Sequence, residues 1–211
     1  MLLRNLTSTN VDVLSHEAAH ALKKDGVVLY PTDTLYGLGA AAFSNTAVDK
    51  IYAIKGREEN KPIHAIVSDL GMAGRYGIVD DRVRKIAEEL PMGKLTFIVP
   101  KRIGTTGGIL RGLKTFGFRI PDNTFCLAMI RAFGGPITAT SANRSGEKTP
   151  NGIGAIFTQL GMNVGFLDIA VNGGDLPASL PSTVIDCTGK KIKILREGAV
   201  SEKDVMRALM L

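Results

Sequence analysis

Tryptophan is absent from this chain of 211 residues, which also has only two cysteines and three histidines. Aromatic residues make up 6% of the sequence, which argues against base stacking as the main mode of nucleic-acid binding. The cysteines, Cys126 and Cys187, form no Cys-x-x-Cys pair, and we expect buried free thiols that suit a reducing cytosol. With so few histidines, any chemistry should depend on positioning and charge stabilisation rather than on a histidine base.

Long hydrophobic runs and two familiar nucleotide-binding loops are also missing. No apolar run approaches the length of about 18 residues that a membrane span requires, and the N-terminus does not look like a signal peptide. We therefore expect no membrane partner and a cytoplasmic location. The glycine-rich segment 104–108 lacks the Gly-Lys-Ser/Thr ending of a P-loop, and no Gly-x-Gly-x-x-Gly opens a helix.

The chain does have a basic balance and many glycines. Its net charge is +6, its isoelectric point is about 9.4, and it contains 24 glycines. This balance favours anionic partners such as nucleotides, phosphates or RNA. With 45% hydrophobic and 22% charged residues, the composition is that of a globular protein, and the length suffices for one good core. We therefore expect a single domain over residues 1–211.

Hydrophobic periodicity and turn residues predict an α/β fold in which a twisted, mostly mixed sheet is flanked by helices. Helices are expected over 15–24 (with Ser15 as N-cap), 46–55, 80–90, 124–133, 154–161 and 201–210 (with Ser201 as N-cap). Strands are expected over 27–30, 63–67, 95–99, 115–120 and 137–140, near 165–170, and over 182–187 and 191–196.

The most informative segment is 31–39, Pro-Thr-Asp-Thr-Leu-Tyr-Gly-Leu-Gly, directly after the expected strand 27–30. Pro31 cannot donate to a sheet ladder, so the strand should end there. Two threonines and an aspartate then follow a strand end, which is where ligands bind in open α/β proteins. Gly37 and Gly39 permit close backbone approach. The alternative is an ordinary turn between a strand and a loop.

Other polar clusters also follow helix or strand ends. Lys55-Gly56-Arg57, with Lys61 nearby, could neutralise phosphates, or it could simply complement a helix dipole. Ser141-Ala142-Asn143 could bind phosphate or ribose, or form a local turn.

Residues 16–20 match His-Glu-x-x-His, a pattern found on zinc-protease helices. Because His64 is the only other histidine, a third ligand would have to be an acid. A five-residue pattern with two free positions also recurs by chance. We therefore expect no protein-bound zinc, and we keep a zinc protease as an alternative.

Taken in order, several motifs strongly resemble the YrdC-like family of threonylcarbamoyl-AMP synthases, from about residue 10 to the C-terminus. They are segment 31–39, Lys55-Gly56-Arg57, Leu95-Thr96-Phe97, Phe118-Arg119-Ile120-Pro121, Ser141-Ala142-Asn143, Pro181-Ser182-Thr183-Val184 and Leu195-Arg196-Glu197-Gly198. The resemblance implies a YrdC-like domain with a basic concave cleft. It also implies synthesis of L-threonylcarbamoyl-AMP from L-threonine, bicarbonate and ATP, with release of pyrophosphate.

The resemblance also implies roles for particular residues. Those expected to bind L-threonine are Thr34, Arg119 and Ser182. Those expected to bind ATP are Arg57, Lys61, Thr115, Ser141, Asn143, Thr149 and Arg196. Those expected to be catalytic are Lys55, Arg57, Ser141 and Asn143. Mg²⁺ should accompany ATP, with no metal held by the protein itself.

Partners implied by the resemblance are tRNA or double-stranded RNA and a downstream threonylcarbamoyl transferase that modifies adenosine 37 of tRNA. One departure is Met92-Gly93-Lys94-Leu95-Thr96, where the family commonly has Pro-Gly-Pro-Leu-Thr. It leaves open a paralogue with the same fold that binds RNA or a nucleotide without this activity.

Overall fold

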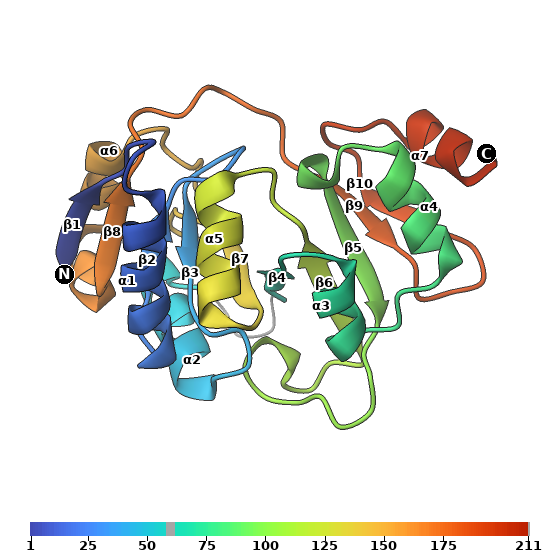
Figure 1. Ribbon diagram of the computed structural model, residues 1–211, viewed down its shortest axis with the longest axis horizontal. Helices are drawn as coiled ribbons and strands as arrows, with labels where there is room; N and C mark the ends of the chain where they lie inside the picture. Colours follow the sequence, from blue (N-terminus) through green and yellow to red (C-terminus); the bar gives the residue numbers. More distant parts are fainter. Residues whose placement is uncertain (58–61, 211) are drawn as a thin grey trace.

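A ten-stranded mixed sheet forms the centre of the structure, a computed structural model that describes residues 1–57 and 62–210 (Figure 1). The strands lie in the order β1-β8-β2-β3-β7-β4-β6-β5-β9-β10. Their bounds are β1 Leu2–Asn5, β2 Val28–Tyr30, β3 Gly37–Gly39, β4 His64–Ile66, β5 Leu95–Pro100, β6 Thr115–Arg119, β7 Ile137–Ser141, β8 Ile169–Asn172, β9 Thr183–Asp186 and β10 Lys193–Arg196.

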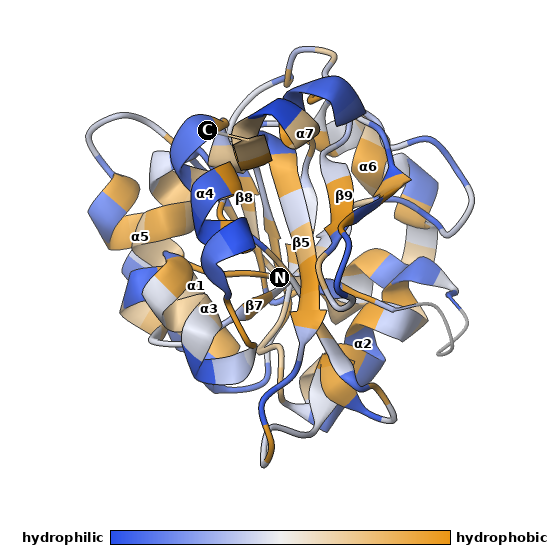
Figure 2. Ribbon diagram, turned by 90° about the vertical axis from the view of Figure 1, so that its right-hand side faces the viewer, coloured by the Kyte–Doolittle hydropathy of each residue, from blue (hydrophilic) through white to orange (hydrophobic). Residues whose placement is uncertain are grey.

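Helices cover both faces of this sheet. The α-helices are α1 Val11–Lys23, α2 Asn45–Lys55, α3 Leu70–Tyr76, α4 Asp81–Glu89, α5 Thr124–Phe133, α6 Ile153–Leu160 and α7 Glu202–Met210. Three short 3₁₀ turns are Met92–Lys94, Gly108–Leu110 and Gly161–Phe166. Figure 2 shows α1, α3, α4 and α5 on one side of the sheet and α2 and α6 on the other. Among the described residues, no helix is long and apolar enough to cross a membrane.

Local signals fix the helix ends near the site. Ser44 caps α2 by accepting a hydrogen bond from the Ala47 amide, and Asn123 caps α5 in the same way through Cys126. Gly56 ends α2 in the left-handed conformation, with φ of 55°, so the chain turns sharply between Lys55 and Arg57. These caps confirm the helices expected over 46–55 and 124–133 to within a residue.

The core is most aromatic where β5 and β6 pair. Phe97 lies opposite Phe118 in the antiparallel register, and their ring centroids are 5.6 Å apart. Phe116 stacks on Phe118 at 5.8 Å, and all three rings are fully buried. Because this pair of strands is rigidly packed, it is a firm support for Arg119 at the end of β6.

Several expected boundaries are wrong. Helix α1 begins at Val11 rather than near Ser15, whose hydroxyl donates inside the helix to the Asp12 carbonyl instead of capping it. The strand expected near 165–170 is displaced: a 3₁₀ turn ends at Phe166, and β8 runs from Ile169 to Asn172. At the C-terminus, Ser201 accepts from the Asp204 amide, which confirms the expected cap.

Strands β1 and β3 and helix α3 have no counterpart in the sequence predictions. Strand β3 is Gly-Leu-Gly, a composition with little strand propensity. Its glycines are required because the Tyr30 ring of β2 packs against them. A Cβ on Gly37 would lie 2.9 Å from the Tyr30 ring.

Candidate functional site

A polar cavity of about 270 Å³ opens at the middle of the sheet, beside the ends of β4, β6 and β7. Its polar side chains come from both halves of the sheet and from the loops at their ends. They are Tyr30, Thr32, Thr34, Tyr36, Arg57, His64, Thr96, Arg119, Thr140, Ser141, Ser182 and Arg196. The site therefore depends on the assembled sheet and not on one local motif.

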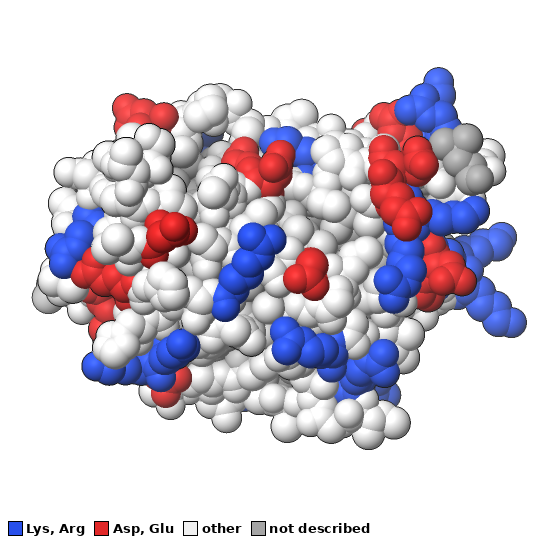
Figure 3. Space-filling view, in the orientation of Figure 1, with Lys and Arg blue, Asp and Glu red and all other residues white. Residues whose placement is uncertain are grey.

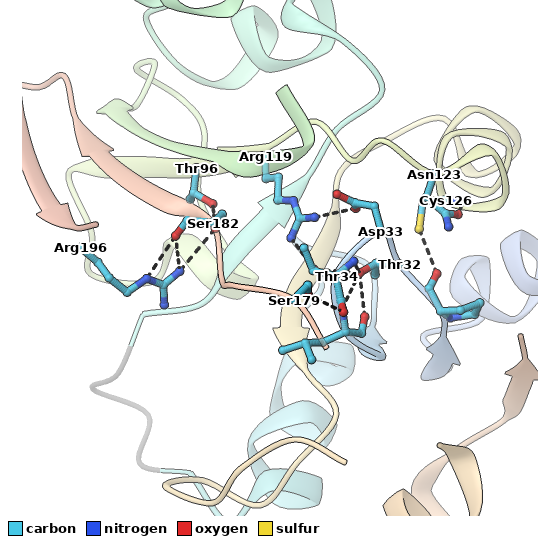
Figure 4. Close-up of polar contacts among 12 residues, drawn as sticks. Thr32, Asp33, Thr34, Thr96, Arg119, Asn123, Cys126, Ser179, Ser182 and Arg196 are labelled. Carbon is cyan, nitrogen blue, oxygen red and sulfur yellow. Dashed lines mark hydrogen bonds and ion pairs between the residues drawn. The ribbon is translucent and has the colours of Figure 1, made fainter. Parts of the chain in front are cut away.

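Arg119 is fixed at the end of β6 by the turn that follows β2 (Figure 4). Its Nη1 donates to the Thr34 hydroxyl at 3.1 Å, and its Nη2 donates to Asp33 Oδ1 at 2.6 Å. The side chains of Asp33 and Arg119 are 10% and 13% exposed, so this ion pair is largely shielded from water. A guanidinium held in this way offers its remaining N–H groups to a carboxylate.

Thr34 is itself held by a compact turn. The Thr32 hydroxyl accepts from the Thr34 and Leu35 amides at 3.0 and 3.1 Å and donates to the Leu35 carbonyl. From the opposite side, Ser179 donates to the Thr34 carbonyl at 2.9 Å. This arrangement is a Ser/Thr turn with one further hydrogen bond from Ser179. Segment 31–39 had two interpretations, a ligand-binding segment or an ordinary turn. The segment is a turn, and the turn builds one wall of the cavity.

Ser182 lies on the opposite wall. Its hydroxyl is within 2.8 Å of the Thr96 hydroxyl of β5, and both side chains are buried. Arg196 donates from Nε and Nη2 to the Ser182 carbonyl, so the guanidinium of β10 is anchored beside the cavity (Figure 4). Burial and the charge of Arg119 lower the pKa of Arg196.

Lys55 is buried behind Ser141 rather than exposed in the cavity. Its ammonium donates to the Ser141 carbonyl, the Asn143 carbonyl and Asn143 Oδ1. Burial and the neighbouring charge of Arg57 lower its pKa to about 7, whereas the three acceptors favour the ammonium form. Since all three donors are used, Lys55 shapes the loop 141–143 from within. This geometry does not place its ammonium in contact with a bound ligand.

Asn143 is also used internally. Its amide donates to the carbonyls of Arg144 and Glu147 at 2.7 Å each, while its Oδ1 accepts from Ser141 and Lys55. The loop that follows β7 is therefore a closed hydrogen-bond network. Within it, Ser141 is the residue that borders the cavity.

His64 was not among the predicted site residues, although it lines the cavity from β4. Burial and the charges of Arg196 and Arg57 lower its pKa to about 4, so the imidazole is neutral near pH 7. The residue in the sequence that could have indicated a buried His64 is Gly117, which lies on the neighbouring strand β6 and leaves room for the imidazole ring. A Cβ there would lie 2.4 Å from His64 Cδ2, but only the strand pairing shows this contact.

A second cavity of about 290 Å³ adjoins the first and is mainly apolar. The two cavities share Pro62, Ile63, His64 and Arg196. Most of the other walls of the second cavity are aliphatic: Ile98, Ile109, Leu110, Leu113, Val184 and Leu195. Thr115 and the backbone of Gly117 also border it. The site is therefore a polar chamber joined to an apolar one, with Arg196 between them.

The structure brings together most of the predicted site residues. Thr34, Arg57, Arg119, Ser141, Ser182 and Arg196 line the polar cavity, and Thr115 lines the apolar one. Thr149 is buried in the loop before α6 and borders neither of the two cavities. Lys61 lies outside the described residues.

No acidic side chain is among the described residues that line the polar cavity. Across residues 1–57 and 62–210, no group of three or more His, Cys, Asp or Glu side chains is placed to hold a metal ion. His16 and His20 are exposed on α1, and Glu17 between them pairs with Arg4 at 2.7 Å. On the face shown in Figure 3, basic and acidic side chains are interspersed. Among the described residues that line the polar cavity, the positively charged side chains are those of Arg57, Arg119 and Arg196.

Comparison with known proteins places the chain in a family. The Sua5/YciO/YrdC family model, described as telomere recombination, matches residues 20–198, and the chain belongs to this family. Threonylcarbamoyl-AMP synthase of Bacillus subtilis is 33% identical over 200 residues, which cover 94% of this chain and 57% of that protein. The Mus musculus protein of the same name is 33% identical over 193 residues, covering 88% of this chain and 67% of that one.

A solved structure shows the same architecture. The crystal structure of P. abyssi Sua5 complexed with L-threonine matches with a TM-score of 0.90 and 26% identity, over 99% of this chain and 61% of that chain. The chain thus spans a little under two thirds of that protein and of the Bacillus subtilis synthase. These matches confirm the predicted family and mixed α/β fold.

Proposed function

We propose that this chain synthesises L-threonylcarbamoyl-AMP from L-threonine, bicarbonate and ATP and releases pyrophosphate. The observation that carries the proposal is that Arg119, held by Thr34 and Asp33, lines a polar cavity that adjoins an apolar one. Relatives that bear the name threonylcarbamoyl-AMP synthase, and a Sua5 structure with L-threonine, support the same conclusion.

The amino acid would occupy the polar chamber. Arg119 keeps N–H groups available for the α-carboxylate, and the hydroxyls of Thr34 and Ser182 border the same space. A pocket that offers hydrogen bonds to a substrate hydroxyl discriminates strongly against analogues that lack it, because its buried polar groups would be left unpaired. L-threonine meets these requirements.

The nucleotide would span both chambers. A purine fits an aliphatic cavity of this size with Thr115 at its edge. The phosphates would then face Arg196, which lines both cavities, and Arg57 and the Ser141 hydroxyl of the polar cavity, since all three can donate hydrogen bonds to an anion. No carboxylate is among the described lining residues, so Mg²⁺ would be held mainly by the phosphates of ATP and would add charge neutralisation there.

The reaction requires no covalent enzyme intermediate. The threonine amine forms a carbamate either by attacking carbon dioxide, with loss of a proton, or by attacking bicarbonate, with loss of water. A carbamate oxygen then attacks the α-phosphorus. A new oxygen–phosphorus bond forms as the bond to pyrophosphate breaks, and Arg57 and Arg196 stabilise the departing charge. Holding the reactants together can contribute about 7–11 kcal/mol to lowering the barrier.

In the cell, the product would supply a transferase that modifies adenosine 37 of tRNA. We propose that the enzyme acts in the cytoplasm. RNA binding without catalysis is the alternative function, and the net charge of +6 is its basis in the sequence.

Mass spectrometry of the product tests the proposal. Purified protein with ATP, L-threonine and bicarbonate should give threonylcarbamoyl-AMP and an equal amount of pyrophosphate. Reactions that lack any one substrate are the matched controls. If the protein binds RNA but forms no adenylate under these conditions, the RNA-binding alternative replaces the proposal.

A further inference from the structure

One carboxylate lies against the site without lining it. Asp33 follows Pro31 and Thr32 in the turn after β2, and its Oδ1 accepts from Arg119 Nη2 at 2.6 Å. Asp33 is not among the lining residues of the cavity, although Arg119 and Thr34 on either side of it are. Figure 4 shows Asp33 and Thr34 meeting the same guanidinium from two directions.

This contact leaves unused hydrogen-bonding capacity inside the protein. Asp33 Oδ2 and Arg119 Nε are buried atoms with no hydrogen-bond partner among the described residues. Burying a charged pair is costly unless something compensates for the lost hydration. A structural ion pair would be expected to use its donors and acceptors more fully. This pair instead leaves one acceptor and one donor unsatisfied, which points to a role for the contact other than stability.

We propose that Asp33 is a positioning residue that orients Arg119 for the carboxylate of the amino-acid substrate. Asp33 and Thr34 each accept a hydrogen bond from one terminal nitrogen of the guanidinium, and together these two bonds fix the plane of the group. Because Arg119 lines the cavity, its guanidinium is held there in a fixed orientation before a ligand binds. This proposal rests on the proposed function for the identity of the substrate, but the orientation of Arg119 can be measured without it.

Gly93, which this chain shares with the family pattern Pro-Gly-Pro-Leu-Thr, packs directly against Asp33. A Cβ on Gly93 would lie 2.7 Å from Asp33 Oδ2 and 2.6 Å from Asp122 Cβ. Any larger side chain at position 93 would therefore displace Asp33.

Steady-state kinetics with two variants test the proposal. Asp33→Ala removes the contact, whereas Asp33→Asn keeps an oxygen that can accept from Arg119. We expect Asp33→Ala to raise the KM for L-threonine roughly 10- to 100-fold with little change in the KM for ATP, and Asp33→Asn to restore part of the loss. Gly93→Ala should have the same selective effect. Asp80→Asn is the control, since Asp80 pairs with Arg82 at the same 2.6 Å distance on α4.

NMR of the Arg119 guanidinium in the ligand-free protein tests the positioning role of Asp33 separately from the proposed synthase activity. Rotation of the guanidinium should be slow in the wild type and in Asp80→Asn, and fast in Asp33→Ala. Equal rotation rates in the wild type and Asp33→Ala would overturn the positioning role, as would a threonine KM within twofold of the wild type. If the rates differ as expected while no adenylate is formed, the positioning role stands and the proposed function fails.

Discussion

Three arginines line the polar cavity, and each is held differently. Arg119 is paired with Asp33, Arg196 is anchored on the Ser182 carbonyl, and Arg57 donates only from Nη2 to the Pro62 carbonyl among the bonds described. Arg57 Nε is buried with no partner among the described residues. Burial lowers the pKa of Arg57, although a guanidinium remains charged at neutral pH. Of the three arginines, Arg57 therefore has the fewest described hydrogen bonds within the protein and the most N–H groups left to donate to a phosphate.

Arg57→Ala should lower kcat/KM by an amount that corresponds to about 2–4 kcal/mol, because charge-assisted hydrogen bonds to the phosphates are lost. The KM for ATP and kcat should both be affected, since the same group binds the substrate and stabilises the leaving pyrophosphate. Arg207→Ala on the exposed face of α7 is a suitable control. An unchanged kcat/KM in Arg57→Ala would remove Arg57 from the nucleotide site.

His64 gives a prediction about pH. Its pKa is about 4 in the folded protein, below the usual 6.5, so between these values the unfolded chain binds more protons than the folded one. The free energy of unfolding should therefore fall as the pH is lowered from about 6.5 to 4. In His64→Gln, this part of the pH dependence should disappear.

Urea denaturation of both proteins at a series of pH values measures this difference. His20→Gln, a change at an exposed position of α1, controls for the general effect of losing a histidine. Identical slopes in the wild type and His64→Gln between pH 4 and 6.5 would show that His64 does not titrate as its burial implies.

Sequence reasoning found most of the cavity residues because they are polar and lie at strand ends, where the resemblance to the family also places them. It could not find Lys55's internal role, since nothing local shows that the loop 141–143 wraps around the ammonium. His64 was missed for a similar reason. Its importance depends on the pairing of β4 with β6, a contact between segments about 50 residues apart.

At the scale of elements, α2 positions two site residues through its C-terminal turn. Gly56 has φ of 55° and no atom within 4 Å of where its Cβ would lie. In Gly56→Ala the new methyl group meets no obstacle, so the effect reports on backbone strain alone. We expect the free energy of unfolding to decrease by about 1 kcal/mol.

Gly74 supplies the matched control for this change. It also has open space around its Cβ position, but it lies inside helix α3 and has no positive φ. Gly74→Ala should leave stability unchanged or raise it by about 0.5–1 kcal/mol. Thermal or urea denaturation measures the free energy of unfolding of both variants. Equal changes in Gly56→Ala and Gly74→Ala would show that the left-handed conformation of Gly56 does not matter for stability.

Long amphipathic elements with clear caps were predictable, as α2, α4 and α5 show. Short elements were not. Strand β3 has three residues and forms because β2 and β7 supply its hydrogen bonds on both sides. Strand β1 pairs with β8 across most of the chain, a contact that no local pattern reveals. Tertiary pairing, not propensity, creates these strands.

At the scale of the whole molecule, the site depends on how the two halves of the sheet join. Strand β7 pairs with β3 on one side and with β4 on the other, and β4 in turn pairs with β6. Thr34 comes from one half, whereas Arg119, Ser182 and Arg196 come from the other, as the two sides of Figure 1 show for their strands. The sequence indicated a mixed sheet, but the strand order that brings these residues together was visible only in the structure.

The selectivity of pyrophosphate release among amino acids tests the central claim most directly. With ATP and bicarbonate present, L-threonine should stimulate release far more than L-valine, which is nearly isosteric but has no hydroxyl to bond within the polar chamber. L-serine should lie between them, because it lacks only a methyl contact worth about 1–3 kcal/mol. If L-threonine stimulates release no more than L-valine does, the chain does not use threonine as its substrate, and the proposed synthase activity is contradicted.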